Sequence, residues 1–389
     1  MTNKKILILM SDTGGGHRSA AEAIAEATHQ LYGEACRVEI ADPWANHTPF
    51  PINRLGQLYG PLLNHSTVLW KLIFRSTSNR RGMSILVKIF WPMVRKSLKD
   101  FLRQSNFDVI VSVHPILTYF SIRALQEANL RIPFVTVVTD LVSLHPLWLC
   151  PETDSCLVPT ELARDRALDS GLPLEKVKVV GLPVGLEFAE GVGEKESLRD
   201  KLGLEQDRPT IMVVGGGEGM GKVYKIARAI AKARINAQLV VVAGRNKSLR
   251  RRLEKVDWEI PTTVFGFVTN MRELMGASDV IVTKAGPTTI SEALIIGLPI
   301  LLSGFIPGQE EGNVEYVTNK GAGTLTERPQ LIAATLAQWL QSENETLTQM
   351  ARKAQRLGHP QAALDIAAEI FNLAQARSSP TQSLSLSRP

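Results

Sequence analysis

Short, uninterrupted apolar segments rich in β-branched residues recur along this chain, and stretches with helical periodicity separate many of them. Continuous apolar runs of this kind are typical of strands in a parallel sheet that helices cover on both faces. The alternation of strands with helices predicts βαβ units, and therefore an α/β fold with doubly wound sheets. The segments expected to be strands are Lys5–Met10, Arg37–Ala41, Val109–Val113, Phe134–Thr139, Ser155–Val158, Val177–Val180, Thr210–Val214, Ala237–Val242, Thr262–Phe265, Val280–Thr283 and Ile300–Leu302.

The alternation occurs twice, and the Gly- and charge-rich segment Pro183–Pro209 separates the two series. A chain of 389 residues has the length of two domains. We expect an N-terminal domain over residues 1–190, a C-terminal domain over residues 191–376, and a disordered, low-complexity tail over residues 377–389. The two Rossmann-like domains are expected to face a cleft, with C-terminal helices closing the structure and ligands bound at the carboxyl ends of strands.

Composition narrows the class of protein. Hydrophobic residues make up 44% of the chain and charged residues 21%, which excludes a mainly disordered or fibrous protein. Three cysteines, Cys36, Cys150 and Cys156, are too few for a disulfide framework and lack the CxxC spacing of a zinc site. No apolar run approaches the ~18 residues of a membrane span, and the N-terminal run is too short for a signal peptide. We therefore expect a protein of the cytoplasm or of the cytoplasmic face of a membrane.

The first of three glycine-rich segments, Gly-Gly-Gly-His at residues 14–17, directly follows the first strand. Glycines let a ligand approach the backbone, and the next helix presents free N–H groups and the positive end of its dipole. A dinucleotide fingerprint needs glycine or alanine in place of Ser19, although Glu39 would suit a ribose, so dinucleotide binding stays an open alternative. His17 is either a surface histidine or a general base, because imidazole titrates near neutral pH.

The second segment, Gly-Gly-Gly-Glu-Gly-Met-Gly-Lys at residues 215–222, follows the first strand of the second series. It approaches the phosphate-loop pattern GxxxxGK[ST], but Val223 stands where the magnesium-binding hydroxyl belongs. Walker-type nucleotide hydrolysis is therefore not expected. A flexible loop with unencumbered backbone donors remains, and it predicts a phosphate cradle.

The third segment, residues 283–293, ends a strand, makes a tight turn and begins a helix near Thr288 or Thr289. A diphosphate can bind at such a helix terminus. Glu292 lies one turn into the helix and is either a ribose-chelating carboxylate or simply an acid that suits a helix N-terminus. Residues 307–313 form a polar loop whose amide and carboxylate groups either contact sugar hydroxyls or face solvent.

Taken in order, these segments resemble the monogalactosyldiacylglycerol synthase family, which includes diacylglycerol glucosyltransferases and is related to MurG-type transferases. The resemblance implies a GT-B fold whose N-terminal domain takes diacylglycerol and whose C-terminal domain takes a UDP-sugar. It also implies inverting transfer of galactose or glucose from UDP-galactose or UDP-glucose. The matching segments run from residue 6 to about residue 325 in family order and spacing: Gly14–His17, Ser112–Pro115, Thr139–Asp140, His145–Pro146, Gly181–Val184, Gly215–Gly221, Thr283–Ala293 and Pro307–Asn313.

The resemblance supports His17 as the base that deprotonates the acceptor, with Asp140 and His145 as alternative bases or orienting partners. The chain contains no Asp-x-Asp, so no metal and no cofactor are expected; helix N-termini, loop amides and Lys284 would neutralise the leaving diphosphate. The family usually has glycine in place of Thr288. Donor binding is assigned to Gly15, Gly16, Gly216, Gly217, Glu218, Gly219, Lys284, Gly286, Pro287, Thr288, Thr289, Glu292 for the ribose, and Gln309, Glu310 and Asn313 for the sugar.

Basic residues are concentrated in one stretch. Lys71–Arg103 holds nine of them and a single acid, Asp100, whereas the net charge of the whole chain is only +6. Aromatic and aliphatic side chains are interleaved with these charges, which predicts an interfacial segment that docks on an anionic membrane surface. The alternative is a core-packed helix with a solvated basic face. Nucleic acid is not expected as a partner, because no recognisable reading motif accompanies the charge.

Two other functions stay open. One is a UDP-sugar transferase that acts on another lipid acceptor, such as a polyprenyl-linked one, and a panel of acceptors separates it from the first. The other is a nucleotide-binding module without turnover. Calorimetry with UDP against NAD tests that alternative.

Overall fold

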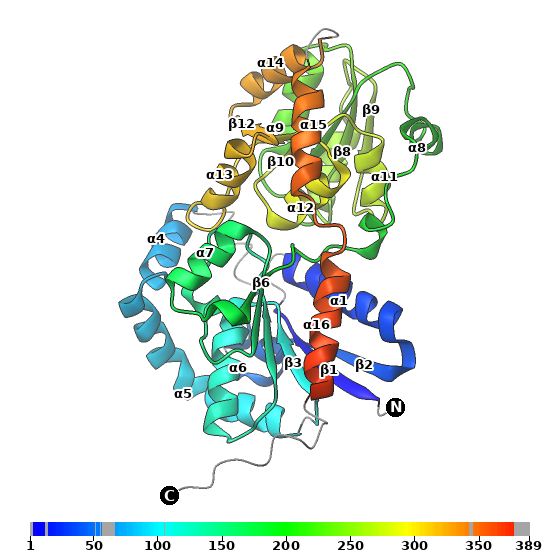
Figure 1. The fold of residues 1–389 in the computed structure, drawn as a ribbon. Coiled ribbons are helices and arrows are strands. Elements are labelled where there is room, and N and C mark those ends of the chain that lie inside the picture. Colours follow the sequence, from blue (N-terminus) through cyan, green and yellow to red (C-terminus); the bar gives the residue numbers. More distant parts are fainter. Residues whose placement is uncertain are drawn as a thin grey trace, which may run out of the picture. The chain divides into compact units, whose positions relative to one another are not determined.

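The computed structural model describes residues 3–11, 15–50, 52–54, 56, 67–104, 106–341 and 345–376, so the expected tail at 377–389 lies outside the described residues. The chain divides into two compact units (Figure 1). Unit 1 comprises the chain up to Gly185 and again from Gln361, and unit 2 is Leu186–Pro360. Each unit contains one six-stranded parallel sheet, which confirms the expected α/β fold with two doubly wound sheets.

The sheet of unit 1 has the order β2-β1-β3-β4-β5-β6, and every neighbouring pair is parallel. Its strands are β1 (Lys4–Leu9), β2 (Cys36–Ala41), β3 (Val109–Ser112), β4 (Phe134–Val137), β5 (Ser155–Val158) and β6 (Val177–Val179). Its main helices are α1 (Gly16–Tyr32), α2 (Pro43–His47), α4 (Thr67–Thr77), α5 (Arg80–Gln104), α6 (Pro115–Glu127), α7 (Glu161–Asp169) and α16 (Ala362–Ala376).

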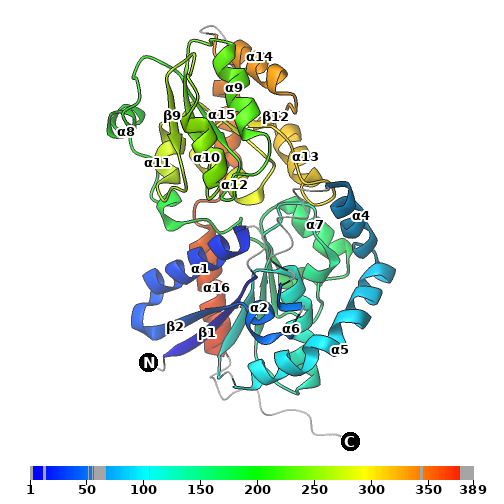
Figure 2. The ribbon, with the colours of Figure 1, turned by 180° about the vertical axis from the view of Figure 1, so that it is seen from behind.

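Alternate side chains of β1 point to opposite faces of this sheet, as the pleat of a strand requires. Leu7 and Leu9 pack with residues of α5 and α6 on one face. Ile6 and Ile8 pack with residues of α1 and α16 on the other face. Figure 2 shows α1 and α16 beside β1 in the view from behind. Both faces of the strand are therefore buried, and this explains why its sequence is a continuous apolar run.

The division into units differs from the expected boundary at residue 190 in two ways. Unit 1 already ends at Gly185, and α16 belongs to unit 1 although it follows all of unit 2 in the chain. The reason lies in packing, because Ile366 and Ile370 are fully buried in the cluster that covers β1. The stacked rings of Tyr32 and Phe371, with centroids 3.8 Å apart, add a second contact between α1 and α16.

The sheet of unit 2 has the order β12-β11-β10-β7-β8-β9, again with parallel neighbours. Its strands are β7 (Thr210–Val214), β8 (Gln238–Val242), β9 (Thr262–Phe265), β10 (Val280–Thr283), β11 (Ile300–Leu302) and β12 (Gly323–Leu325). Its helices are α8 (Lys195–Leu202), α9 (Val223–Lys232), α10 (Lys247–Glu254), α11 (Met271–Gly276), α12 (Pro287–Ile296), α13 (Glu311–Asn319), α14 (Pro329–Trp339) and α15 (Thr346–Leu357).

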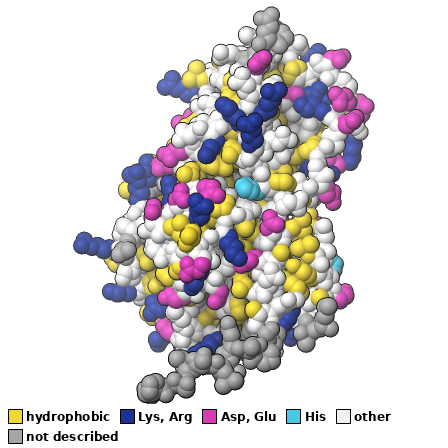
Figure 3. All heavy atoms as spheres, viewed as in Figure 1, with side chains coloured by type: hydrophobic (Ala, Val, Ile, Leu, Met, Phe, Trp, Pro, Cys, Tyr) yellow, Lys and Arg dark blue, Asp and Glu magenta, His cyan; other side chains and the backbone are white. Residues whose placement is uncertain are grey.

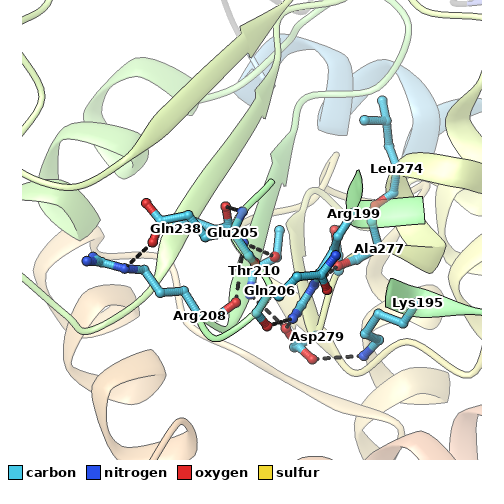
Figure 4. Close-up of polar contacts among 11 residues, drawn as sticks. Lys195, Arg199, Glu205, Gln206, Arg208, Thr210, Gln238, Leu274, Ala277 and Asp279 are labelled. Carbon is cyan, nitrogen blue, oxygen red and sulfur yellow. Dashed lines mark hydrogen bonds and ion pairs between the residues drawn. The ribbon is translucent and has the colours of Figure 1, made fainter. Parts of the chain in front are cut away.

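An ion-pair network at the amino ends of β7 and β10 fastens α8 to the sheet of unit 2 (Figure 4). One carboxylate oxygen of Asp279 accepts from the guanidinium of Arg199 and from the backbone N–H of Thr210, both at 2.7 Å, and the other pairs with Lys195 at 2.8 Å. Arg199 also donates to the carbonyl oxygens of Ala277 and Gln206. This network ties α8 to the residues that begin β7 and β10.

Candidate functional site

His17 lies in the first turn of α1, beyond the carboxyl end of β1. Gly15 caps the helix with a left-handed backbone (φ 80°), and Gly16 is the first helical residue. The Nδ1 atom of His17 lies 2.7 Å from the carbonyl oxygen of Val113 and 3.0 Å from the hydroxyl of Thr139. Because a carbonyl oxygen can only accept, Nδ1 carries the proton and Nε2 keeps its lone pair. The fold thus holds His17 in the tautomer that a general base requires.

The surroundings of His17 also keep it uncharged. Burial lowers its pKa to about 4, and the bond to the Val113 carbonyl opposes this shift only in part. The ring of His114 packs against it edge to face, with centroids 4.6 Å apart. Burial, and secondarily the neighbouring His17, hold the pKa of His114 well below its usual value. At neutral pH both rings are therefore neutral, and His17 can accept a proton.

The other two candidates, Asp140 and His145, lie in the loop that follows β4, and both are buried. The carboxylate of Asp140 accepts from the indole N–H of the fully buried Trp148 at 2.8 Å. His145 Nδ1 accepts from the backbone N–H of Leu147 at 3.2 Å, while its Nε2 lies 3.2 Å from the hydroxyl of Thr77 on α4. Both nitrogens of His145 are thus engaged, and burial lowers its pKa to about 4.

A cavity of about 410 Å³ opens beside α1 at the carboxyl ends of β1 and β2. Its walls are partly apolar and partly polar, which suits a molecule with a polar head and apolar chains. The Oδ1 atom of Asn53, on this wall, is buried and has no hydrogen-bond partner among the described residues. The side chains that line the cavity include Met10, Ser11, Arg18, Ile40, Asp42, Trp44, Asn46 and Asn53.

In unit 2, the loop after β7 folds back tightly on itself. Gly216 and Gly219 have positive φ angles of 70° and 59°, and the N–H of Gly219 bonds to the carbonyl of Gly216 at 3.0 Å. A Cβ atom on Gly219 would collide with the carbonyl oxygen of Ala243. This loop needs glycine for its backbone conformation and for space, so the fold alone accounts for the glycines at positions 216 and 219.

Arg245 holds the same loop from the side. Its backbone N–H donates to the carbonyl of Gly217 at 2.8 Å, and its guanidinium pairs with Glu218 at 3.0 Å. The guanidinium also lies over the ring of Phe267, 4.3 Å from its centroid. Arg245 therefore compensates the charge of Glu218 beside a loop expected to bind phosphate, a role that the sequence pattern did not indicate.

Lys284 lies where the loops after β7 and β10 come together. Its ammonium group is 2.6 Å from Oε1 of the buried Glu310, whose Oε2 accepts from the backbone N–H of Ile306 at 2.8 Å. A Cβ atom built on Gly286 would lie 2.9 Å from this ammonium group, and one built on Gly216 would lie 3.8 Å from Cε of the same lysine. The side chain thus places a fixed positive charge between the two glycine-rich loops.

Helix α12 begins directly after Gly286, with Pro287 as its first residue and Thr288 and Thr289 in its first turn. Thr288 has no positive φ angle, so its Cβ atom fits where the family usually has glycine. Glu292 follows one turn later; burial raises its pKa to about 8, and the nearby Glu187 adds to the shift. A half-buried carboxyl group with a raised pKa is a candidate for ligand binding.

The polar loop before α13 supports this turn from behind. The amide of Asn313, which is 1% exposed, donates from Nδ2 to the carbonyl of Ala285 at 2.9 Å. Its Oδ1 atom is buried and has no hydrogen-bond partner within the described ranges. Gln309 lies in the turn directly before α13. The structure thus gathers Lys284, Glu310 and Asn313 around the start of α12.

Helices α4 and α5 form an amphipathic pair on the surface of unit 1. Trp91 of α5 donates its indole N–H to Glu127 of α6 at 2.8 Å, and the guanidinium of Arg123 covers the same ring at 4.6 Å. Figure 3 shows Lys and Arg side chains and apolar side chains along this edge of the molecule. The large apolar side chains that the pair exposes are Val68, Leu69, Leu72, Ile73, Ile85, Ile89 and Met93. Exposed basic side chains beside them are Arg75, Arg81, Lys88, Arg95 and Lys96.

The described residues contain neither a membrane-spanning helix nor a metal-binding cluster. None of their helices combines the length and the apolar character that crossing a membrane requires. Within the same ranges, no group of three or more His, Cys, Asp and Glu side chains is placed to hold a metal ion.

Comparison with known sequences identifies relatives for nearly the whole chain. A family model described as monogalactosyldiacylglycerol (MGDG) synthase matches residues 17–184, and one described as glycosyltransferase family 28 C-terminal domain matches residues 210–368. A probable chloroplastic monogalactosyldiacylglycerol synthase of Glycine max is 41% identical over 96% of this chain and 72% of its own length. Monogalactosyldiacylglycerol synthase 2 of Arabidopsis thaliana is also 41% identical, over 96% of this chain and 82% of its own length.

Solved structures with the same fold are more distant in sequence. MurG of Acinetobacter baumannii is 16% identical, with a TM-score of 0.61 over 95% of this chain and 99% of its own. HepE of Anabaena, solved in complex with UDP and glucose, is 16% identical, with a TM-score of 0.54 over 97% of this chain and 100% of its own. These likenesses show that the two units have the fold of GT-B glycosyltransferases.

Proposed function

Because the chain belongs to the monogalactosyldiacylglycerol synthase family, we propose that it makes a membrane galactolipid with the residues described above. It is a glycosyltransferase that transfers galactose from UDP-galactose to diacylglycerol. Inversion at the anomeric carbon gives a β-linked monogalactosyldiacylglycerol and releases UDP. The observation that carries this function is the neutral His17 ring, whose Nδ1 is bound to a backbone carbonyl so that Nε2 can take a proton.

The donor binds in unit 2. The start of α12 and the amides of the loop after β7 receive the diphosphate, and the Lys284 ammonium group balances the charge that develops on the departing UDP. Glu292 accepts hydrogen bonds from the ribose hydroxyls, while Gln309, Glu310 and Asn313 surround the sugar or support the groups that contact it. The positive charge of Lys284 provides the neutralisation that a metal ion supplies in other transferases, so the reaction proceeds without a metal.

The acceptor binds in unit 1. The cavity beside α1 takes the glycerol head of diacylglycerol, whose hydroxyl can donate to the buried Oδ1 of Asn53. His17 Nε2 removes the proton of the attacking hydroxyl as the oxygen bonds to the anomeric carbon and the bond to UDP breaks. Asp140 and Thr139 hold the loop that orients this base.

The α4–α5 pair docks the enzyme on an anionic membrane surface, where its acceptor is dissolved. Exposed apolar side chains enter the interfacial region, and basic side chains beside them meet the lipid headgroups. Each basic residue near such a surface contributes about 1 kcal/mol to attraction. We place the enzyme as a peripheral protein at the cytoplasmic face of its membrane.

Radiolabelled donors test the reaction directly. The enzyme is incubated with UDP-[¹⁴C]galactose or UDP-[¹⁴C]glucose and with diacylglycerol or a polyprenyl phosphate in vesicles. We expect lipid-soluble label from UDP-galactose with diacylglycerol, and NMR of the product should show a β-glycosidic bond. Label on the polyprenyl acceptor alone, or an α-linked product, would contradict the proposal.

A further inference from the structure

The loop that follows β4 is fastened to the last turn of α4 by one side chain, His145. Its Nδ1 accepts from the N–H of Leu147, so Nε2 carries the proton and donates to the hydroxyl of Thr77 at 3.2 Å. The ring of Phe74, one turn earlier on α4, packs edge to face on His145 with centroids 5.5 Å apart. Both nitrogens and one edge of the imidazole are thus committed to holding two elements together.

From this contact, a continuous polar connection leads to the base. The N–H of Trp148 bonds to the carbonyl of His145 at 2.9 Å, and the indole N–H of Trp148 bonds to Asp140 at 2.8 Å. The residue before Asp140 is Thr139, whose hydroxyl lies 3.0 Å from Nδ1 of His17. Each step is a hydrogen bond or a peptide link, and Trp148, the bulkiest member, is fully buried. A shift of α4 therefore displaces a packed connection rather than a loose loop.

The other end of the connection is the surface where lipid docks. Four of the exposed large apolar side chains of unit 1 lie on α4: Val68, Leu69, Leu72 and Ile73. The hydroxyl of Thr77 also donates to the carbonyl of Ile73 at 2.8 Å, so the residue that receives His145 is bonded to the turn that carries the apolar side chains. Helix α4 has eleven residues, and the bond between Thr77 and His145 holds its end. When a lipid surface also holds its apolar side, these two restraints together fix the orientation of the helix relative to the loop after β4.

We propose that His145 is a positioning residue that couples the docking of α4 on a lipid surface to the placement of the base His17. The proposal rests on the proposed function and deepens it, because it makes turnover depend on the membrane and not only on the supply of acceptor. Docking of α4 fixes Thr77, Thr77 fixes His145, and the loop beyond His145 fixes Thr139 against the imidazole.

The test compares two acceptors in one protein. Transfer of galactose is measured on diacylglycerol in phosphatidylcholine–phosphatidylglycerol vesicles and on a short-chain diacylglycerol dispersed below its micelle concentration without vesicles. In the wild type we expect a higher kcat on vesicles. Thr77→Val removes the hydroxyl and keeps the side-chain shape, and it should lower the vesicle-to-dispersed ratio about fivefold, the effect of one neutral hydrogen bond. Its rate on the dispersed acceptor should stay within about twofold of the wild-type rate.

Ser76→Ala is the matched control, because Ser76 also donates to the carbonyl of Ile73, whereas the hydroxyl that meets His145 is that of Thr77. It should keep the wild-type ratio. Flotation with vesicles should be the same for the wild type, Thr77→Val and Ser76→Ala, which separates coupling from docking.

A second variant protects the test from a trivial loss of structure. His145→Gln can keep one of the two hydrogen bonds of the imidazole but not both. The double variant His145→Gln, Thr77→Val should lower the vesicle-to-dispersed ratio no further than the stronger single variant, because both changes break the same connection. A wild-type ratio in Thr77→Val, or additive losses in the double variant, would overturn the coupling. A wild type without preference for vesicles would overturn it as well, while absence of galactolipid with both acceptors would instead refute the proposed function.

Discussion

The carboxyl edges of the two sheets present opposite kinds of chemistry. In unit 1 the segments after β1, β3 and β4 carry His17, His114 and His145, and burial lowers the pKa of all three. In unit 2 the loops after β7 and β10 surround a charged pair, Lys284 and Glu310. An imidazole accepts a proton only while it is neutral, whereas a cation stabilises a diphosphate. The same sheet architecture meets both needs because the chemistry resides in the loops.

The outer surfaces of the units differ as well. In unit 1 the exposed large apolar side chains are concentrated on α4 and α5. In the described part of unit 2 they are isolated, namely Val192, Phe267 and Leu331. Scattered apolar residues are ordinary on a protein surface, but a cluster beside basic residues marks an interaction site. We therefore propose that both the base and the membrane surface belong to unit 1.

The largest expected effect comes from removing the neutral base. His17→Ala should lower kcat by about 10²–10⁴-fold, the usual contribution of a general base, and leave UDP affinity within about twofold. Because the pKa of His17 is lowered to about 4, the ring stays unprotonated above that pH. The wild-type rate should thus fall only as the pH drops through about 4. Kinetics and UDP calorimetry measure these effects.

His29→Ala is the control for this variant, since His29 is exposed in the last turn of the same helix. It should behave as the wild type. A normal kcat in His17→Ala would contradict the assignment of His17 as the general base.

Removing the cation of unit 2 should have the next largest effect. Lys284→Met leaves the developing charge on UDP uncompensated and should lower kcat by about 10²–10³-fold, with weaker UDP binding. Lys225→Met, an exposed lysine of α9, should change neither quantity. Equal UDP affinity for both variants and the wild type would show that Lys284 does not act on the diphosphate.

The contrast between the surfaces predicts a smaller effect on membrane binding. Replacing Ile85 and Ile89 of α5 by Asp adds two negative charges where apolar side chains should meet lipid, and should weaken vesicle binding about 10- to 100-fold. Leu331→Asp makes one such replacement on unit 2 and should leave flotation unchanged. If all variants float equally, lipid docks elsewhere.

The smallest effect is expected at the amino edge of unit 2, the edge opposite the loops after β7 and β10. Asp279→Asn removes the partner of Arg199 and Lys195, and should lower the free energy of unfolding by about 1–2 kcal/mol because the network is partly exposed to solvent. Thermal unfolding measures the loss. At 25 °C kcat should stay at the wild-type value, and a large drop in kcat would mean that this network reaches the site.

Sequence patterns predicted most of the fold because strands covered on both faces are uninterrupted apolar runs. Each expected strand is present, and Ser155–Val158, Thr210–Val214, Thr262–Phe265, Val280–Thr283 and Ile300–Leu302 have the expected bounds. The strand β12 was missed, since three residues that begin with glycine carry almost no periodicity. The expected helix at the end of the chain is also present, but which sheet it covers depends on complementary apolar surfaces and not on local pattern.

The candidate site shows the same limit. Glycine-rich loops after strands were visible in the sequence, because backbone conformation restricts those positions to glycine. The partners were not visible: Val113 is 96 residues from His17, and Glu310 is 26 residues from Lys284. Contacts of that kind arise only when parallel strands bring distant loops to one edge. The tautomer of His17 and the link from His145 to Thr77 therefore follow from the three-dimensional structure and could not be predicted from the sequence.

The place of α16 has a consequence for synthesis on the ribosome. Unit 2 is complete once Pro360 has been made, whereas the face of β1 that bears Ile6 and Ile8, which α1 covers in part, gains the rest of its cover with Ile366 and Ile370. Domains usually fold in the order in which they emerge, but here the later unit can finish first. The apolar face of β1 therefore stays partly uncovered until α16 has been made, and in that interval the chain would gain most from a chaperone.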